Sequence, residues 1–103
     1  MARVRERFGE EVNRKAKGTR NEHKSIAFLE GYGYRCTRAA ASLGVWDIVG
    51  INKESVVLVQ VKSNRWPGKK EREEMRKFKA PPCCEKHIHL WRDGAGEPER
   101  EII

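Results

Sequence analysis

Three polar side chains, those of Asp47, Gln60 and Lys62, occur within the most apolar part of this sequence. Two runs rich in β-branched residues, 44–51 and 56–63, contain them and are separated by four polar residues, a pattern typical of a β-hairpin. Strand side chains alternate between the two faces of a sheet, so a regular hairpin would bring all three polar groups onto one face. Such a grouping is unfavourable for packing and therefore indicates a functional site.

The register of this hairpin follows from a loop centred between Lys53 and Glu54. The predicted pairs are Ile51 with Val56, Val49 with Leu58 and Asp47 with Gln60. The opposite face carries aliphatic side chains: those of Ile48, Val57, Val59 and Val61. Both faces of the hairpin therefore need cover from other elements.

Asp47 and Gln60 offer oxygen ligands, and Lys62 adds a cation. Oxygen ligands suit Mg²⁺ or Mn²⁺, which polarises a phosphate oxygen and lowers the pKa of a bound water. The Lys62 ammonium could orient the nucleophile or stabilise developing charge, so the predicted reaction is metal-dependent phosphodiester hydrolysis. Each residue alone also has an ordinary interpretation: Asp47 as a turn cap or the partner of an arginine, and Gln60 and Lys62 as exposed strand positions.

A fourth candidate is Glu22, which follows Thr19 by three residues in the pattern of a capping box. Apolar residues at helical spacing after it predict a helix over residues 20–30, with Gly18 before it and Gly31 as its C-cap. Glu22 is then either a capping carboxylate or a carboxylate directed at the site from the first helical turn.

The remaining chain predicts a small α/β domain with a mixed sheet. Residues 1–17 form a basic N-terminal arm or a helix, and residues 18–103 form the domain itself. A short strand is expected within 32–38, followed by a connection of small residues at 39–43. A helix over 69–78 with few apolar positions, a strand over 86–92 and a terminal edge strand over 100–103 complete the order.

The chain has 103 residues, of which 36% are charged, and a formal net charge of +7. A basic excess on a single small domain favours a polyanionic partner such as nucleic acid. No apolar run approaches the ~20 residues that cross a bilayer, and no apolar stretch follows the N-terminal charges as in a signal peptide. These features predict no membrane partner and a cytoplasmic location, associated with the nucleoid or, for a viral source, in the host cytoplasm.

The cysteines and histidines near the C-terminus suggest an alternative metal module, because Cys83, Cys84, His87 and His89 lie close together. Structural zinc sites usually draw ligand pairs from two separated arms, and the sequence offers one. The alternation of His87 and His89 with Ile88 and Leu90 instead predicts a half-exposed strand. Three cysteines, two of them adjacent, do not indicate a disulfide framework.

The order of Glu22, Asp47 and Gln60-Val61-Lys62 resembles that of the PD-(D/E)XK nuclease superfamily. Within it, the segments 17–22, 38–42 and 46–49, together with the strand ending at Lys62, resemble archaeal-type Holliday junction resolvases. The resemblance covers residues 17–63, and the C-terminal third matches in element order. It implies a small restriction-endonuclease-like α/β domain with a central mixed sheet flanked by helices, DNA cleavage and dependence on Mg²⁺, for which Mn²⁺ could substitute.

The resemblance also implies a role for each matching residue. Glu22, Asp47 and Gln60 would be on the metal side, and Lys62 would be the catalytic lysine. Ser42 lies where such resolvases often carry a functional serine. Junction resolvases act on branched DNA as homodimers, since two symmetric strands must be cut.

Two features depart from the resolvase pattern. Gln60 stands where those resolvases have glutamate, which removes one negative charge from the metal side, although a Gln-X-Lys form also occurs in Mrr-like and VRR-type nucleases. The chain is also short, which leaves less surface for a dimer interface. Two alternatives therefore remain: a Mrr- or VRR-like nuclease acting on flaps, ends or duplex DNA, and a non-catalytic nucleic-acid-binding module with a degenerate nuclease fold.

Basic residues near Glu22 and the hairpin are expected to contact DNA phosphates without recognising base sequence. The predicted phosphate contacts are Lys17, Arg20, Lys24, Arg38, Arg65 and Lys69. For any single one of them, an ordinary solvated position is the simpler interpretation.

Overall fold

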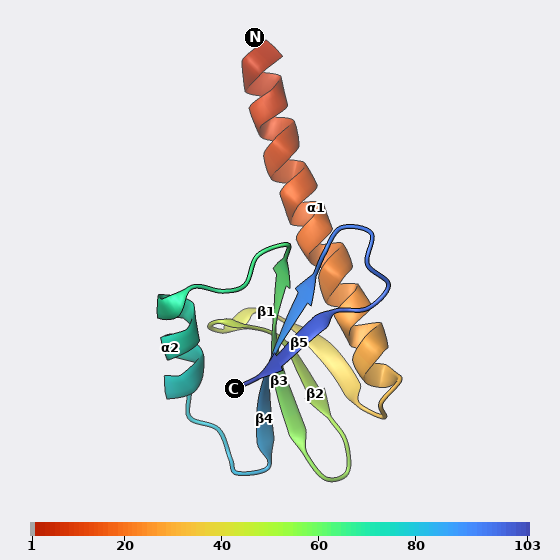
Figure 1. Ribbon diagram of the computed structural model, residues 1–103, viewed down its shortest axis with the longest axis vertical. Coiled ribbons are helices and arrows are strands. Elements are labelled where there is room, and N and C mark those ends of the chain that lie inside the picture. The colour runs from red at the N-terminus through yellow and green to blue at the C-terminus, as the bar shows by residue number, and fades with distance from the viewer. Residues whose placement is uncertain (1) are drawn as a thin grey trace.

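The chain forms two helices and five strands in a computed structural model that describes the backbone of residues 2–103 and the side chains of residues 14–103. Along the chain (Figure 1) they are α1 (Ala2–Glu30), β1 (Arg35–Leu43), β2 (Trp46–Ile51), β3 (Val56–Ser63), α2 (Lys69–Lys77), β4 (Cys84–Trp91) and β5 (Glu99–Ile102). This order matches the predicted one, including the terminal strand.

The strands form one five-stranded sheet in the order β1-β2-β3-β4-β5. The β3–β4 pair is parallel, and the other three pairs are antiparallel. α2 lies in the β3–β4 connection, as expected for a parallel crossover. The prediction of a small α/β domain with a central mixed sheet is therefore confirmed.

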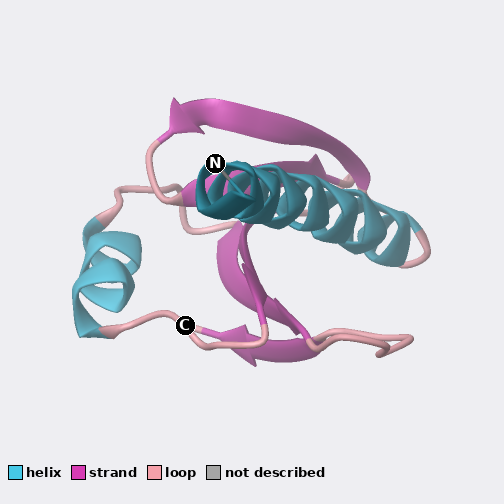
Figure 2. Ribbon diagram, turned by 90° about the horizontal axis from the view of Figure 1, so that it is seen from above, coloured by secondary structure: helices cyan, strands magenta, loops and turns pink. Residues whose placement is uncertain are grey.

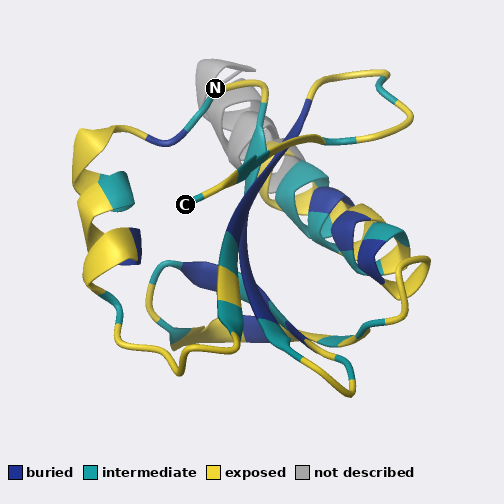
Figure 3. Cartoon of the chain, turned by 60° about the horizontal axis from the view of Figure 1, so that its bottom comes forward, coloured by how far each residue is buried: buried dark blue, intermediate teal, exposed yellow. Residues whose placement is uncertain are grey.

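The helices cover opposite faces of the sheet (Figure 2). Each helix packs in a different hydrophobic cluster, and the two clusters use alternate residues of β3, whose side chains point to opposite faces. The first cluster joins Leu29 of α1 to Ile48, Val57 and Val59. The second joins Met75 of α2 to a different set of sheet residues: Trp46, Leu58 and Ile88. Met75 is completely buried while most of α2 faces solvent (Figure 3). Both faces of the hairpin are thus covered, as its sequence predicted.

The first helix is longer than predicted, since α1 continues through Gly18 and Thr19 without a break. The expectations that Gly18 ends one segment and that Thr19 caps another are wrong. An interior glycine costs a helix only about 1 kcal/mol relative to alanine, and strong helix formers (Arg, Lys, Glu and Ala) surround it. The predicted end is confirmed at Glu30. Neither helix of the described chain is long and apolar enough to span a membrane.

The first strand extends beyond the prediction, through the small residues 39–43 that were expected to form a connection. Its pairing with β2 shifts register between Arg38 and Leu43. Ala40 and Ala41 have φ angles of 49° and 66° at this irregularity, a region that residues with a Cβ atom rarely adopt. The irregular end of β1 thus begins directly after Arg38, the last residue in regular register with β2 before the shift.

The histidines of β4 are buried, so the prediction of a half-exposed strand is wrong. His87 is 7% exposed and His89 is fully buried. β4 is an inner strand, paired with β3 and β5, and Ser25 of α1 contacts His89 from one face of the sheet. Trp91 Nε1 donates a hydrogen bond to Ser25 Oγ at 2.7 Å, and Ser25 Oγ lies 2.9 Å from His89 Nδ1. The Ser25 hydroxyl can then donate to Nδ1, which favours a neutral imidazole. Burial, helped by the charges of His87 and Arg100, lowers the pKa of His89 to about 3.

Because the pKa of buried His89 is lowered, we expect the folded protein to lose stability in acid. An unfolded histidine has a pKa of about 6.5, so below that pH the unfolded chain binds a proton that folded His89 refuses. We expect His89 alone to lower the free energy of unfolding by about 2 kcal/mol between pH 7 and pH 5, with the loss continuing toward pH 3. Urea unfolding at both pH values measures it. His89→Asn should lessen the pH dependence, whereas the same change at exposed His23 should not. Equal pH dependence in both variants would contradict this account.

Candidate active site

The hairpin of β2 and β3 has the predicted register. Ile51 pairs with Val56, and Val49 pairs with Leu58. The side chain of Asn52 fixes the loop, because its Oδ1 accepts hydrogen bonds from the backbone N–H groups of Glu54 (2.8 Å) and Ser55 (2.7 Å). The described pairing ends at Ile48 and Val59, one position before the expected pair of Asp47 and Gln60.

Asp47 lies where the β2–β3 ladder ends, and its carboxylate contacts the neighbouring strand. Its Oδ2 accepts a hydrogen bond of 2.8 Å from the backbone N–H of Val61. The pKa of Asp47 is raised, chiefly by burial and also by the negative charges of Glu22 and Glu71, while the Val61 hydrogen bond and the Lys62 ammonium act in the opposite direction. Several charged groups are therefore near enough to act on Asp47.

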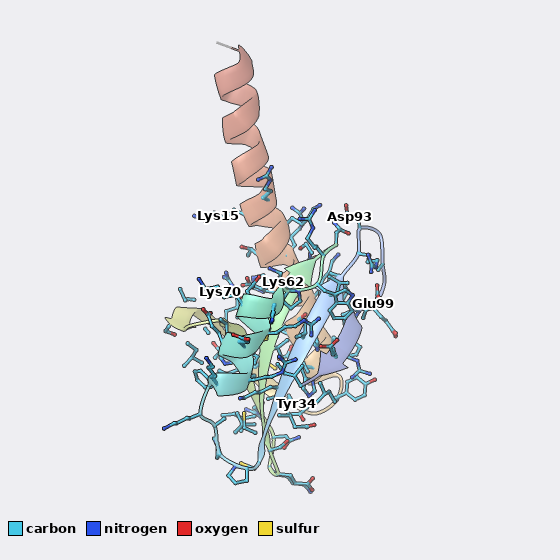
Figure 4. All side chains as sticks on the ribbon, turned by 60° about the vertical axis from the view of Figure 1, so that its left-hand side comes forward. Lys15, Tyr34, Lys62, Lys70, Asp93 and Glu99 are labelled. Atoms are coloured by element: carbon cyan, nitrogen blue, oxygen red, sulfur yellow. The ribbon has the colours of Figure 1, made fainter. Side chains whose placement is uncertain are left out.

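Gln60 and Lys62 are joined by Glu71, a residue of the first turn of α2. Gln60 Nε2 donates to Glu71 Oε2 at 3.0 Å, and Lys62 Nζ lies 3.4 Å from the same oxygen. Lys62 projects from β3 beside α2 (Figure 4). The sequence interpretation missed Glu71, although it precedes Met75 by four residues and so lies on the same face of the helix. The burial of Met75 against the sheet could have indicated it.

Glu22 approaches from the other helix. Asn21 Nδ2 donates a hydrogen bond of 2.6 Å to Ser63 Oγ, which ties this turn of α1 to the end of β3, next to Lys62. Arg38 Nε donates to Glu22 Oε1 at 2.7 Å. Glu22 is in the interior of α1, so both the capping role and the position in a first helical turn are wrong. Its charge nevertheless acts on Asp47.

The fit of this site to a divalent cation rests on Gln60, which is 5% exposed. Its Oε1 is buried and has no hydrogen-bond partner among the described residues, a state that costs about 1–3 kcal/mol. The described side chains form no group of three His, Cys, Asp or Glu residues arranged to hold a metal. The oxygens of Asp47, Glu22 and Gln60 nevertheless match the ligand type that Mg²⁺ prefers.

Comparison with known proteins identifies the family. The model of the archaeal Holliday junction resolvase (Hjc) family matches residues 13–79, more than half of the chain and a stretch that contains every candidate site residue. The chain belongs to this family. The prediction of a PD-(D/E)XK nuclease of the resolvase type is thereby confirmed, and the enzyme class is that of a nuclease, a hydrolase.

A solved structure agrees with this assignment at the level of the fold. The Hjc of Archaeoglobus fulgidus, a Holliday junction resolvase from an archaeal hyperthermophile, superimposes with a TM-score of 0.63 and 20% sequence identity, over 84% of each chain. No curated protein sequence matches this chain significantly. The restriction-endonuclease-like architecture that the resemblance implied is therefore confirmed by structure as well as by family.

Ser42 of this resolvase-family chain lies on the irregular end of β1. Its hydroxyl donates a hydrogen bond to the carbonyl of Ala39, and the residue is exposed. No described contact joins Ser42 to Asp47, Gln60 or Lys62, so the structure does not bring it into the carboxylate group. The preceding Ala40 and Ala41 have left-handed backbone, which in residues other than glycine tends to occur at functional sites. The functional role of Ser42 itself stays a prediction.

The six predicted phosphate contacts divide into two groups. Three engage other side chains: Lys17 Nζ lies 3.0 Å from Asp93 Oδ1, Lys24 lies over the Trp91 ring at 5.5 Å, and Arg38 binds Glu22. The other three are exposed: Arg20, Arg65 and Lys69. Lys24 and Arg38 are exposed as well, so five of the six have the accessibility that phosphate binding requires.

Proposed function

We propose that this protein is a metal-dependent endodeoxyribonuclease that resolves Holliday junctions. The observation that carries the proposal is the polar end of the β2–β3 hairpin, where Asp47, Gln60 and Lys62 lie together in a chain of the resolvase family. Carboxylates from both helices act on the same aspartate. We expect the protein to work on DNA in the cytoplasm, in association with the nucleoid or, for a viral source, in the host cytoplasm.

In this proposal Glu22, Asp47 and the free amide oxygen of Gln60 hold Mg²⁺, for which Mn²⁺ substitutes. When bound, such an ion supplies charge stabilisation for the phosphate and an activated water. The pKa of Asp47 is raised by burial and by neighbouring carboxylates, which is the electrostatic condition that a cation relieves. The Val61 N–H holds Oδ2 of Asp47 in place.

The proposed role of Lys62 is to stabilise charge on the scissile phosphate or to orient the nucleophile. Its side chain is 29% exposed and already faces a carboxylate, that of Glu71. An ammonium in such a partly dehydrated position acts on developing negative charge more strongly than one in bulk water. Exposed Arg20, Arg65 and Lys69 would hold the DNA backbone in register without reading its sequence.

The substrate proposal is tested by cleavage of matched four-way junction, flap and linear duplex DNA by the wild-type protein with Mg²⁺. We expect paired, symmetric nicks confined to the junction. Asp47→Ala should leave all three substrates intact. Cleavage that prefers flaps, ends or duplex DNA would keep the site but assign the chain to the Mrr- or VRR-like alternative.

Sedimentation at micromolar concentration provides a second test, because two symmetric cuts call for a two-fold dimer. We expect a homodimer. A monomer under these conditions would contradict the resolvase proposal and favour a nuclease that makes single cuts.

A further inference from the structure

One carboxylate of the site was not among the predicted metal ligands. Glu71 belongs to α2, whose Met75 is fully buried against the sheet. Four residues separate the two, so both lie on the face of α2 that packs on β3. The helix is thereby fixed with Glu71 beside the Gln60-Val61-Lys62 segment.

The hydrogen bond between Gln60 and Glu71 determines how the Gln60 amide is turned. A carboxylate only accepts hydrogen bonds, so the amide nitrogen must face Glu71, as observed at 3.0 Å. The amide oxygen then faces away from Glu71, is buried and has no partner among the described residues. A buried oxygen of this kind is available to a cation, and Glu71 is the group that directs it.

The candidate metal site also needs negative charge to hold a divalent cation. Gln60 is neutral, so the proposed ligands carry one negative charge fewer than they would with a glutamate at position 60. Arg38 also offsets part of the charge of Glu22, with which it is paired at 2.7 Å. Glu71 is paired as well, but with Lys62 at the longer distance of 3.4 Å. The side chain of Glu71 is 42% exposed and therefore accessible from solvent. Mg²⁺ prefers oxygen ligands, and the Glu71 carboxylate would add its negative charge to that of Asp47 and Glu22.

We propose that Glu71 supplies to the divalent-metal site the negative charge that position 60 lacks, acting with Asp47 while its bond to Gln60 turns the amide oxygen toward the ion. This inference rests on the proposed function, because it concerns the same site. It separates two tasks that a single glutamate at position 60 could perform: residue 60 gives the oxygen, and residue 71 gives the charge.

The test is Mn²⁺ binding to the full chain by isothermal titration calorimetry, without DNA. We expect Glu71→Gln to weaken Mn²⁺ affinity about tenfold or more. The double variant Gln60→Glu/Glu71→Gln, which moves the charge to position 60, should recover most of that loss. Glu73→Gln removes the same charge from an exposed position of α2 and should bind as the wild type does. Thermal unfolding of each variant verifies that the chain is folded.

The outcomes separate this inference from the function on which it rests. Wild-type affinity in Glu71→Gln, with affinity lost in Asp47→Ala, would overturn the role of Glu71 and leave the proposed metal site. A double variant as weak as Glu71→Gln would likewise overturn the division of tasks. Wild-type affinity in Asp47→Ala would overturn the metal site itself.

Discussion

Lys62→Ala is expected to abolish DNA cleavage while leaving DNA binding within a few-fold of wild type. The Lys62 ammonium is ion-paired with Glu71 at 3.4 Å, and its charge acts on Asp47. Loss of one preorganised electrostatic group of this kind typically lowers turnover by about 10²–10³. Binding should persist, because it depends on many surface cations rather than on one half-buried lysine. Single-turnover cleavage and fluorescence anisotropy on the same labelled DNA measure the two effects.

The matched control is Lys53→Ala, which removes the same charge from the exposed hairpin loop, at the other end of β3. We expect this variant to cleave at the wild-type rate. Retained turnover in Lys62→Ala would falsify the assignment of the lysine. Parallel loss of binding and cleavage would instead make Lys62 a phosphate contact.

Asp47→Asn is expected to lose cleavage and gain thermal stability. The raised pKa of Asp47 means that the folded chain disfavours the charged carboxylate, mainly because of burial and partly because of Glu22 and Glu71. Stability from this group is therefore lower at pH 7, where the carboxylate is ionised, than in acid, where it is protonated. Asparagine removes the charge and keeps an oxygen that can accept from Val61 N–H.

We expect the Tm of Asp47→Asn at pH 7 to rise; for scale, each ~1 kcal/mol shifts the Tm of a domain near 100 residues by about 4 °C or more. Glu54→Gln, which changes an exposed carboxylate in the hairpin loop, should shift it little. A Tm that falls in Asp47→Asn would mean that the carboxylate stabilises the fold and is a structural residue. A side chain that lowers the stability of the fold is more typical of a functional site than of a structural position.

The hairpin could be predicted because its information is local. A loop capped by Asn52 and strict alternation fix which side chains share a face, and the observed pairs of Ile51 with Val56 and Val49 with Leu58 follow. The same register placed Asp47 beside the Gln60–Lys62 segment, and the hydrogen bond from Val61 N–H to Asp47 agrees with that placement. The shared role of the three side chains stays a prediction. Their partners on other elements depend on contacts between distant parts of the chain.

The start of α1 and the burial of β4 could not be predicted for a related reason. Gly18 has a small local cost, and neighbouring helix formers outweigh it. His87 and His89 alternate with apolar residues as in an exposed strand, yet both are buried: β5 makes β4 an inner strand, and Ser25 of α1 contacts His89. The local sequence pattern indicates whether a segment is a helix or a strand, whereas its tertiary neighbours decide which of its faces is exposed to solvent.

Glu71 illustrates the same limit within the site. Its helix was expected and its spacing to Met75 was readable, but nothing in the local sequence states which strand α2 covers. Contact with Gln60 and Lys62 appears once the β3–β4 crossover is formed. A charged helix with a single fully buried side chain was thereby sufficient to deliver a carboxylate to the site.

The most direct test of the central claim is single-turnover cleavage of a labelled four-way junction at saturating protein. Wild type and Asp47→Asn are compared with Mg²⁺, with Mn²⁺ and with EDTA. We predict paired nicks by the wild type with either metal, and none with EDTA or in the variant. Tight binding without cleavage by the wild type in both metals would contradict the account, because the chain would then be a nucleic-acid-binding module with an inactive nuclease fold.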